Sequence, residues 1–504
     1  MRLHFIAFLA GLIAATAFQP LGLWPAIPLA FAVFLWSLER APTLRAALAR
    51  GWWFGLGQFV LGLNWIAIAF TYQAAMPAWL GWVAVLLLSL YLAVYPALAA
   101  GLAWRWAGGD RLSLTLLLAA AWIVGEWLRA TMFTGFAWNP AGVALLPTFW
   151  ARGATLVGTY GVSAHAVLLG GALRALADRD WRAGLGLVAG ATAVAVAGLL
   201  ISPPRHAPAG PAVRLVQPNI GQDLKSAGLA DAEALNRLRR LSAHDPNRPT
   251  IILWPEAAVD EPIATGLRYR YAQAEAAALR REVGAAIGPR DILLSGFVTL
   301  RARDGRHVSS GTNSVFALAP DGRVLARYDK AHLVPYGEYL PMAAILAPLG
   351  LARLVPGDVY FDPGPGPRSI ALPGVGKVGF QLCYEIIFSG EVVDRHDRPA
   401  FLFNPSNDAW FGAWGPPQHL AQARMRALEE GLPILRATPT GVSAVVDADG
   451  ALVVSLPPGR MGAIDSRLPA AKPPTPFAKT GNLMPFLFAL LLAAAAIAVR
   501  RRTR

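Results

Sequence analysis

The chain has 504 residues, of which 55% are hydrophobic and only 15% are charged. Soluble globular proteins carry about a quarter charged residues, so this composition excludes an ordinary soluble protein and indicates that much of the chain lies in lipid. The formal net charge of +14 does not indicate a nucleic-acid partner, because the arginines cluster at the ends of apolar runs. The single cysteine, Cys383, excludes an intramolecular disulfide and a cysteine-rich metal or iron–sulfur site within one chain.

Apolar stretches of roughly membrane-spanning length recur along the chain. They predict about eight transmembrane helices, at residues 4–18, 23–38, 52–70, 79–104, 112–128, 154–173, 184–201 and 483–499. The first two are short of the roughly 20 residues that a bilayer core requires. Seven stretches in succession with almost no internal charge argue against the alternative of buried core helices. The first stretch also fits a signal peptide, because Arg2 precedes an apolar run that ends in small residues.

The arginines predict the orientation of these helices. Thirteen of them lie at one set of helix ends and two, Arg129 and Arg152, lie in the opposite loops. Because cytoplasmic loops are enriched in arginine and lysine, both termini are expected to be cytoplasmic. Lys472 and Lys479, on the outer side of the last helix, weaken this bias slightly. After seven crossings, residues 202–482 are then expected on the outer side of the membrane.

This outer segment reads as a separate α/β domain between two proline-rich linkers, residues 203–211 and 469–476. The predicted organisation is an N-terminal membrane domain at 1–202, an outer domain at 212–467 and a C-terminal helix at 483–499. Short strands are expected at residues 213–216, 250–254, 292–300, 314–318, 378–383, 400–403, 434–437 and 443–446. Helices are expected near residues 229–243, 266–287 and 418–431.

Common hydrolase signatures such as H-E-x-x-H, G-x-S-x-G and the P-loop are absent from the sequence, and the scattered histidines predict no metal site. Three polar residues instead stand at or just past predicted strand ends: Glu256, Lys330 and Cys383. Taken singly, each has an ordinary explanation as a solvated charge or a small buried thiol. Together they are the carboxylate base, cation and thiol that thiol-based acyl transfer requires.

The segments around these residues resemble the nitrilase superfamily with its Glu-Lys-Cys triad. The matching motifs are Trp254-Pro255-Glu256, Lys330 with Pro335-Tyr336-Gly337-Glu338, and Cys383-Tyr384-Glu385. Predicted membrane helices on both sides of the domain narrow the resemblance to the apolipoprotein N-acyltransferases. Two further segments fit: Thr134-Gly135-Phe136-Ala137-Trp138, with alanine where a proline is expected, and Asn407-Asp408-Ala409-Trp410-Phe411.

The resemblance implies a polytopic α-helical membrane domain joined to a nitrilase-like αββα sandwich whose triad meets in one pocket. Cys383 is then the nucleophile, Glu256 the general base, and Lys330 the cation that favours the thiolate and stabilises the oxyanion. Glu338 is expected to hold Lys330 in place, because an unpaired buried ammonium is costly. Tyr384 and Glu385 are expected either to shape the pocket or simply to pack beside the nucleophile.

The implied reaction needs no cofactor and no metal. Cys383 takes an acyl chain from a phospholipid, with phosphatidylethanolamine the preferred donor, and passes it to the α-amine of the diacylglyceryl-cysteine at the N-terminus of an apolipoprotein. Because both substrates are anchored in the membrane, Trp410, Phe411 and Trp414 are candidate lipid contacts in a mobile loop.

Two other functions fit parts of the sequence. A membrane-anchored nitrilase-like amidase would use the same triad and pass its acyl group to water, although anchoring alone needs only one helix. A transporter or sensor with an outer binding domain would have functional charges inside its helices and internal repeats, and neither is evident.

Overall fold

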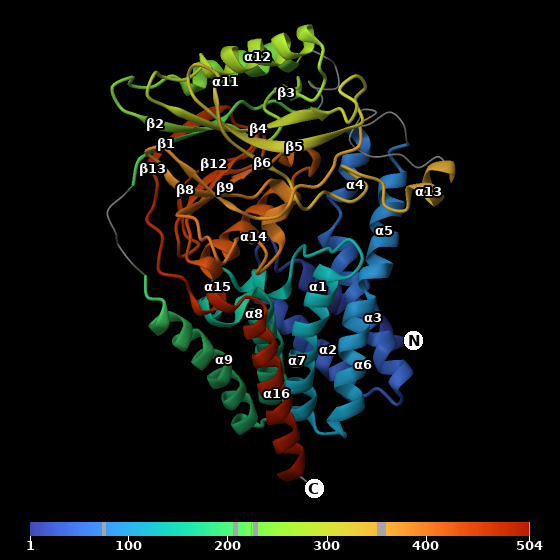
Figure 1. Ribbon diagram of the computed structural model, residues 1–504. Helices are drawn as coiled ribbons and strands as arrows, with labels where there is room; N and C mark the ends of the chain where they lie inside the picture. The colour runs from blue at the N-terminus through green and yellow to red at the C-terminus, as the bar shows by residue number, and fades with distance from the viewer. Residues whose placement is uncertain (73–76, 205–209, 223, 225–229, 350–358, 503–504) are drawn as a thin grey trace.

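The computed structural model describes residues 1–72, 77–204, 210–222, 224, 230–349 and 359–502. Helices make up one half of the molecule and two β-sheets with their own helices make up the other (Figure 1). The C-terminus lies at the end of the helical half that is farthest from the sheets. The first predicted linker, residues 203–211, lies largely outside the described residues.

The helical half is built from long apolar helices with short connections. Asp110 and Thr43 cap two of these helices by accepting hydrogen bonds from backbone N–H groups three residues later, at 2.6 and 3.2 Å. The helices are α1 (Arg2–Ala15), α2 (Ala26–Glu39), α3 (Leu44–Gly62), α4 (Ile66–Ala69), α5 (Leu80–Leu92), α6 (Val94–Ala107), α7 (Arg111–Thr131), α8 (Ala154–Ala177), α9 (Trp181–Ile201) and α16 (Leu483–Arg502), with 3-10 turns η1 (Phe70–Tyr72), η2 (Ala141–Leu145) and η3 (Phe149–Gly153).

Within the described residues, five helical segments are long and apolar enough to cross a membrane. They are Leu80–Ala107, Arg111–Thr131, Phe149–Ala177, Trp181–Ile201 and Leu483–Arg502. The pair α3 and α4–η1 is bent by 48° and adds at most one span. The predicted count of about eight is therefore not confirmed. The reason is length: α1 and α2 have 14 residues each, and a helix of that length is about 21 Å long, against a hydrocarbon core of roughly 30 Å.

The other half contains two mixed β-sheets. Among the described residues the first sheet has seven strands in the order β13-β1-β2-β4-β5-β6, with β3 paired to β4, and the second has six in the order β12-β11-β10-β9-β8-β7. In each sheet three central strands run parallel, β1-β2-β4 and β8-β9-β10. The first sheet comprises β1 (Ala212–Gln217), β2 (Thr250–Leu253), β3 (Ala264–Thr265), β4 (Ile292–Arg301), β5 (Ser310–Leu318), β6 (Val324–Asp329) and β13 (Gly462–Arg467). The second comprises β7 (Ser369–Leu372), β8 (Gly376–Phe380), β9 (Phe401–Pro405), β10 (Ile434–Ala437), β11 (Ser443–Val446) and β12 (Leu452–Leu456).

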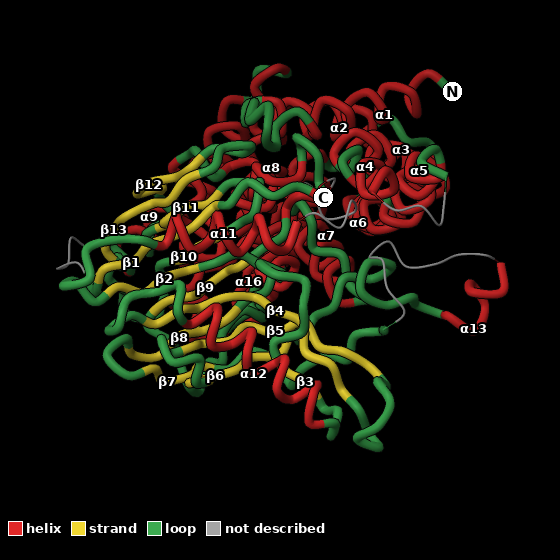
Figure 2. The backbone as a smooth tube through the Cα atoms, turned by 90° about the horizontal axis from the view of Figure 1, so that it is seen from above, coloured by secondary structure: helices red, strands yellow, loops and turns green. Residues whose placement is uncertain are grey.

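The layers follow from the alternation of side chains along these strands. In β9, Phe401 and Phe403 join the core between the two sheets, whereas Leu402 points to the opposite face and joins the core of the helical half. The helices α11 (Ala230–Ser242) and α12 (Arg270–Gly284) lie over the outer face of the first sheet, as the view from above shows (Figure 2). Helix α14 (Gly415–Glu430) covers the second sheet and packs on its other side against the membrane helices.

The result is an αββα sandwich whose α14 layer is shared with the helical half. The predicted strands are all present, with ends shifted by up to four residues. The predicted strand at 378–383 ends at Phe380, because the chain turns there and Cys383 begins a 3-10 turn, η5 (Cys383–Ile387). The remaining elements are α13 (Ala343–Leu346), η4 (Ala347–Leu349), η6 (Asp408–Trp410) and α15 (Pro476–Thr480).

Candidate active site

The three residues predicted to form the triad each follow the end of a β-strand. Glu256 lies three residues beyond β2, Lys330 directly follows β6, and Cys383 lies three residues beyond β8 in the facing sheet. All three residues are buried, with 5%, 1% and 5% of their surface exposed, respectively. Buried charges persist only where they are paired, so the contacts of these groups decide what the site can do.

A buried cluster forms around the ammonium of Lys330. Its Nζ lies 3.0 Å from the carboxylate of Glu338 and 3.4 Å from Oε1 of Glu256. Asn313 of β5 bridges the two carboxylates by donating to Glu256 at 2.7 Å and to Glu338 at 2.8 Å. The remaining oxygen of Glu338 accepts from the backbone N–H of Val334 at 2.8 Å. One cation is thus held between two fixed carboxylates.

The charges in this cluster act on one another. Burial alone would lower the pKa of Lys330, but the negative charges of Glu338 and Glu256 outweigh it and raise that pKa above its usual value. Burial raises the pKa of the Cys383 thiol well above its usual value, and Glu256 adds to this, while Lys330 opposes it. Lys330 is therefore a permanent cation, and the resting Cys383 is a protonated thiol that needs a base to ionise it.

The backbone is strained beside two of these residues. Cys383 has φ of +49° and Ala257, next to Glu256, has φ of +47°, values that non-glycine residues rarely adopt. Gly296 of β4 passes so close to Glu256 that a Cβ there would lie 2.7 Å from the Glu256 Cα. The sharp turn at Cys383 directs this thiol away from the line of its strand, as such strained turns do at other active sites.

Glu385 and Tyr384 hold the turn that carries Cys383. The carboxylate of Glu385 accepts hydrogen bonds from the Tyr328 hydroxyl and from the N–H groups of Ala331, His332 and Leu382, at 2.9, 2.7, 3.1 and 2.7 Å, respectively. Glu385 therefore ties the Cys383 turn to the segment that follows Lys330. The Tyr384 hydroxyl donates to the carbonyl of Gly135 at 3.1 Å, which joins the same turn to the loop after α7.

The candidate lipid contacts lie at the junction of the two halves. Phe411 packs edge-on against Trp65 of the helical half, with ring centroids 4.6 Å apart, and Trp410 contacts Tyr72 at 5.9 Å. Trp414 directly precedes α14 and packs against the shared core. All three are partly buried. Their predicted lipid contact stays a prediction.

Sequence reasoning missed several residues of the site. Asn313 lies inside a strand whose predicted start, residue 314, excluded it; the polar run Thr312-Asn313-Ser314 in an otherwise apolar strand was the available signal. Asn407, whose backbone N–H donates to Oε2 of Glu256 at 2.8 Å, was noted only as part of a motif. No cluster of three or more metal-ligating side chains occurs in the described part of the chain.

Two family models together match most of the chain. The model for the apolipoprotein N-acyltransferase N-terminal domain matches residues 10–172, and the model for carbon-nitrogen hydrolases matches residues 213–471. Full-length relatives agree. Apolipoprotein N-acyltransferases of Bradyrhizobium diazoefficiens and Ralstonia nicotianae are each 37% identical, covering 99% of this chain and 94% and 95% of theirs, and that of Rhodopseudomonas palustris is 34% identical over 95% and 91%.

Among solved structures, Nit3 of Saccharomyces cerevisiae, a member of the nitrilase superfamily, is 18% identical and covers 52% of this chain and 90% of its own, with a TM-score of 0.37. Because that score is low, the assignment of the α/β half to a nitrilase-like fold rests on the carbon-nitrogen hydrolase match and on the two sheets described above.

Proposed function

The chain belongs to the apolipoprotein N-acyltransferase family, and we propose that it moves an acyl chain from a phospholipid to the N-terminal diacylglyceryl-cysteine of an apolipoprotein through a thioester on Cys383. The observation that carries this mechanism is the buried cluster of Glu256, Lys330 and Glu338, in which the charges of Glu256 and Lys330 act on the thiol of Cys383. A membrane half fits substrates that are themselves lipids.

In the first half-reaction, Cys383 Sγ attacks an ester carbonyl of the phospholipid while its proton passes to Glu256. The carbonyl oxygen becomes an oxyanion that the ammonium of Lys330 stabilises. The ester C–O bond then breaks, and the departing lysophospholipid oxygen takes the proton back from Glu256. Because burial keeps the resting thiol protonated, ionisation and attack are coupled through Glu256.

In the second half-reaction, the α-amine of the acceptor attacks the thioester carbonyl and gives a proton to Glu256. The C–S bond breaks and the sulfur recovers that proton, which leaves an amide on the acceptor and a free thiol on the enzyme. A thioester is activated towards amines, and the amide product is more stable than the starting ester. No energy-supplying cofactor is needed.

Glu256 is arranged to carry protons in both steps. One of its oxygens accepts from Asn313 and the other from the N–H of Asn407, so the carboxylate is held in one orientation beside the thiol. The ammonium of Lys330 is shared with Glu338. Because Glu338 also balances the charge of Lys330, Glu256 is not tied up in an exclusive ion pair. Glu256 is then available to accept a proton.

We propose that this bacterial membrane protein is a multi-pass protein of the inner membrane, with both termini cytoplasmic and the catalytic half periplasmic. The arginines at the helix ends support this orientation. Eight crossings require that the short helices α1 and α2 each span the membrane, together with the bent pair of α3 and α4–η1. Phosphatidylethanolamine is the expected donor, and Trp410, Phe411 and Trp414 are proposed to meet the lipid near the junction.

The test is direct detection of the thioester. The purified protein is incubated without acceptor with a phospholipid carrying a labelled acyl chain, and Cys383 is examined by mass spectrometry for a hydroxylamine-sensitive label. We expect labelled Cys383 that a diacylglyceryl-cysteine peptide discharges quickly and water discharges slowly. Cys383→Ala is the control and should carry no label.

The possible failures point to different errors. A wild type without label would reject the phospholipid as donor. A label that water removes as fast as the peptide does would keep the nucleophile and reject the acceptor, which leaves an amidase-like hydrolase.

A further inference from the structure

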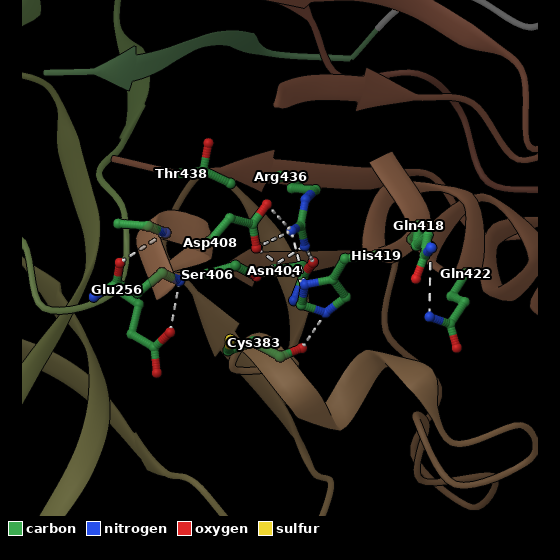
Figure 3. A network of polar contacts seen from close by, with 12 residues as sticks. Glu256, Cys383, Asn404, Ser406, Asp408, Gln418, His419, Gln422, Arg436 and Thr438 are labelled. Carbon is green, nitrogen blue, oxygen red and sulfur yellow. Dashed lines mark hydrogen bonds and ion pairs between the residues drawn. The ribbon is translucent and has the colours of Figure 1, made fainter. Parts of the chain in front are cut away.

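Behind Cys383 lies a chain of buried polar contacts that the Glu256–Lys330–Cys383 set does not include (Figure 3). Arg436 of β10 donates to both carboxylate oxygens of Asp408, at 2.8 and 2.7 Å. Oδ1 of Asp408 lies 3.0 Å from Nδ1 of His419, and Nε2 of the same ring lies 3.0 Å from the carbonyl oxygen of Cys383. All three side chains are fully buried.

The direction of these hydrogen bonds follows from the groups involved. A carbonyl oxygen can only accept, so Nε2 of His419 carries a proton and donates it to Cys383. Burial and the positive charge of Arg436 lower the pKa of His419, against the opposing effect of Asp408. Nδ1 of the ring lies 3.0 Å from both Oδ1 of Asp408 and Nη2 of Arg436, so contacts at both ring nitrogens fix the orientation of the ring.

The same residues hold the segment that carries Asn407. Arg436 also donates to the Ser406 hydroxyl at 2.8 Å and to the side-chain oxygen of Asn404. The guanidinium of Arg436 thus bonds to three side chains of the segment 404–408, those of Asn404, Ser406 and Asp408. Within that segment the backbone N–H of Asn407 donates to Glu256 at 2.8 Å, and the same N–H acts to lower the pKa of the Cys383 thiol.

We propose that Asp408, His419 and Arg436 are positioning residues for acyl transfer, which fix the Cys383 carbonyl and the Asn407 N–H so that the thiol faces Glu256. Cys383 has positive φ, a conformation that non-glycine residues rarely adopt and that persists only where its surroundings hold it. The donor from His419 acts on the carbonyl of that same residue. The inference rests on the proposed role of Cys383 as nucleophile.

The helical half supports this arrangement from its own side. The ring of Trp138, in the loop after α7, lies 5.2 Å from the ring of His419, and its Nε1 donates to Gln418 on the same helix at 2.7 Å. Arg129 of α7 in turn donates to the Trp138 carbonyl at 2.7 Å. His419 therefore lies between Trp138, in the loop after α7, and the carbonyl of Cys383.

The test compares His419→Phe, which keeps a ring but has no donor, with His419→Gln, whose amide N–H can replace Nε2–H. The rate of thioester formation on Cys383 is measured across phospholipid concentrations and expressed per folded protein. We expect His419→Phe to lower the maximal rate about 100-fold with half-saturation changed less than about twofold, and His419→Gln to stay within about tenfold of the wild type. His165→Phe, which replaces a buried histidine of α8, is the matched control and should keep the wild-type rate.

A second measurement needs no lipid: the rate at which iodoacetamide alkylates Cys383 in the same variants. We expect the same order, with His419→Phe slowest. Equal rates for His419→Phe and wild type would overturn the inference, as would equal impairment of the Phe and Gln variants. If the wild type forms no thioester but alkylation follows this order, the proposed acyl donor is wrong and the positioning role stands.

Discussion

At the scale of single residues, the site depends on one cation shared by two carboxylates. Lys330 lies 3.0 Å from Glu338 and 3.4 Å from Glu256, and Asn313 donates to both acids. A general base must be free to take a proton, and a base locked in an ion pair loses that capacity. Glu338 therefore matters because it is the closer ion-pair partner of Lys330, which leaves Glu256 more weakly paired.

Replacing Glu338 with glutamine removes this ion pair while keeping the size of the side chain. Lys330 is then left with Glu256 as its nearest anionic partner, which lowers the basicity of the carboxylate that must ionise Cys383. We expect thioester formation to fall on the order of 100-fold, with the protein still folded. The measurement is the rate of labelled acyl transfer to Cys383. Glu233→Gln, on the exposed side of α11, is the control, and equal rates for both variants would contradict this role of Glu338.

The sequence was sufficient to select Glu256, Lys330, Glu338 and Cys383 as candidates, because each stands at or after a strand end or in a matching motif. It did not select Asn313, because the predicted strand began at residue 314 and the polar run Thr312-Asn313-Ser314 does not by itself indicate a catalytic role. Nor could it join His419 to Cys383. That contact depends on how α14 packs beside the η5 turn, and packing geometry is not encoded in local spacing.

At the scale of elements, α14 connects the two halves through its last turn. Glu429 accepts from the N–H and hydroxyl of Thr159, at 2.5 and 2.6 Å, where α8 is interrupted by Gly158 with φ of +65°. The carboxylate thus satisfies the backbone N–H of Thr159 beside the break in α8. A continuous apolar stretch at residues 154–173 predicted a helix but not this break, because glycine in a helix is tolerated and the reason for the break lies 270 residues away.

The neighbouring Glu430 makes the stability of this junction depend on pH. Burial, with the adjacent Glu429, raises its pKa from 4.5 to about 7. Between these values the folded protein binds more protons than the unfolded chain, so the free energy of unfolding falls as the pH rises from about 4.5 through about 7. The full effect is on the order of 3 kcal/mol.

Glu430→Gln removes this titration. We expect the variant and the wild type to have similar melting temperatures near pH 4.5, and the variant to become the more stable of the two as the pH approaches 7.5. Thermal unfolding of the detergent-solubilised protein over that range measures the difference. Glu282→Gln, on exposed α12, should track the wild type throughout, and parallel curves for Glu430→Gln would contradict the assignment.

At the scale of the whole molecule, the α/β half sits on the membrane half through α14, the loop after α7 and the aromatic contacts of Phe411. Composition and apolar stretches were enough to predict two halves of different type. They did not settle the number of membrane spans, because hydropathy gives the extent of an apolar run but not the length of the helix within it. The 14-residue helices α1 and α2 are the critical case.

The proposed topology can be tested with single cysteines, because Cys383→Ala leaves a chain without cysteine. Four exposed positions are informative: Leu21 between α1 and α2, Arg40 after α2, Glu282 on α12 and Arg502 at the end of α16. If α1 and α2 each cross the membrane and the catalytic half is periplasmic, a membrane-impermeant maleimide added to cells with a permeabilised outer membrane labels cysteine at 21 and 282. Cysteine at 40 and 502 then reacts only after the inner membrane is broken. Labelling at 282 without labelling at 21 would mean that α1 and α2 enter the bilayer without crossing it, and all four positions must react after lysis for the comparison to hold.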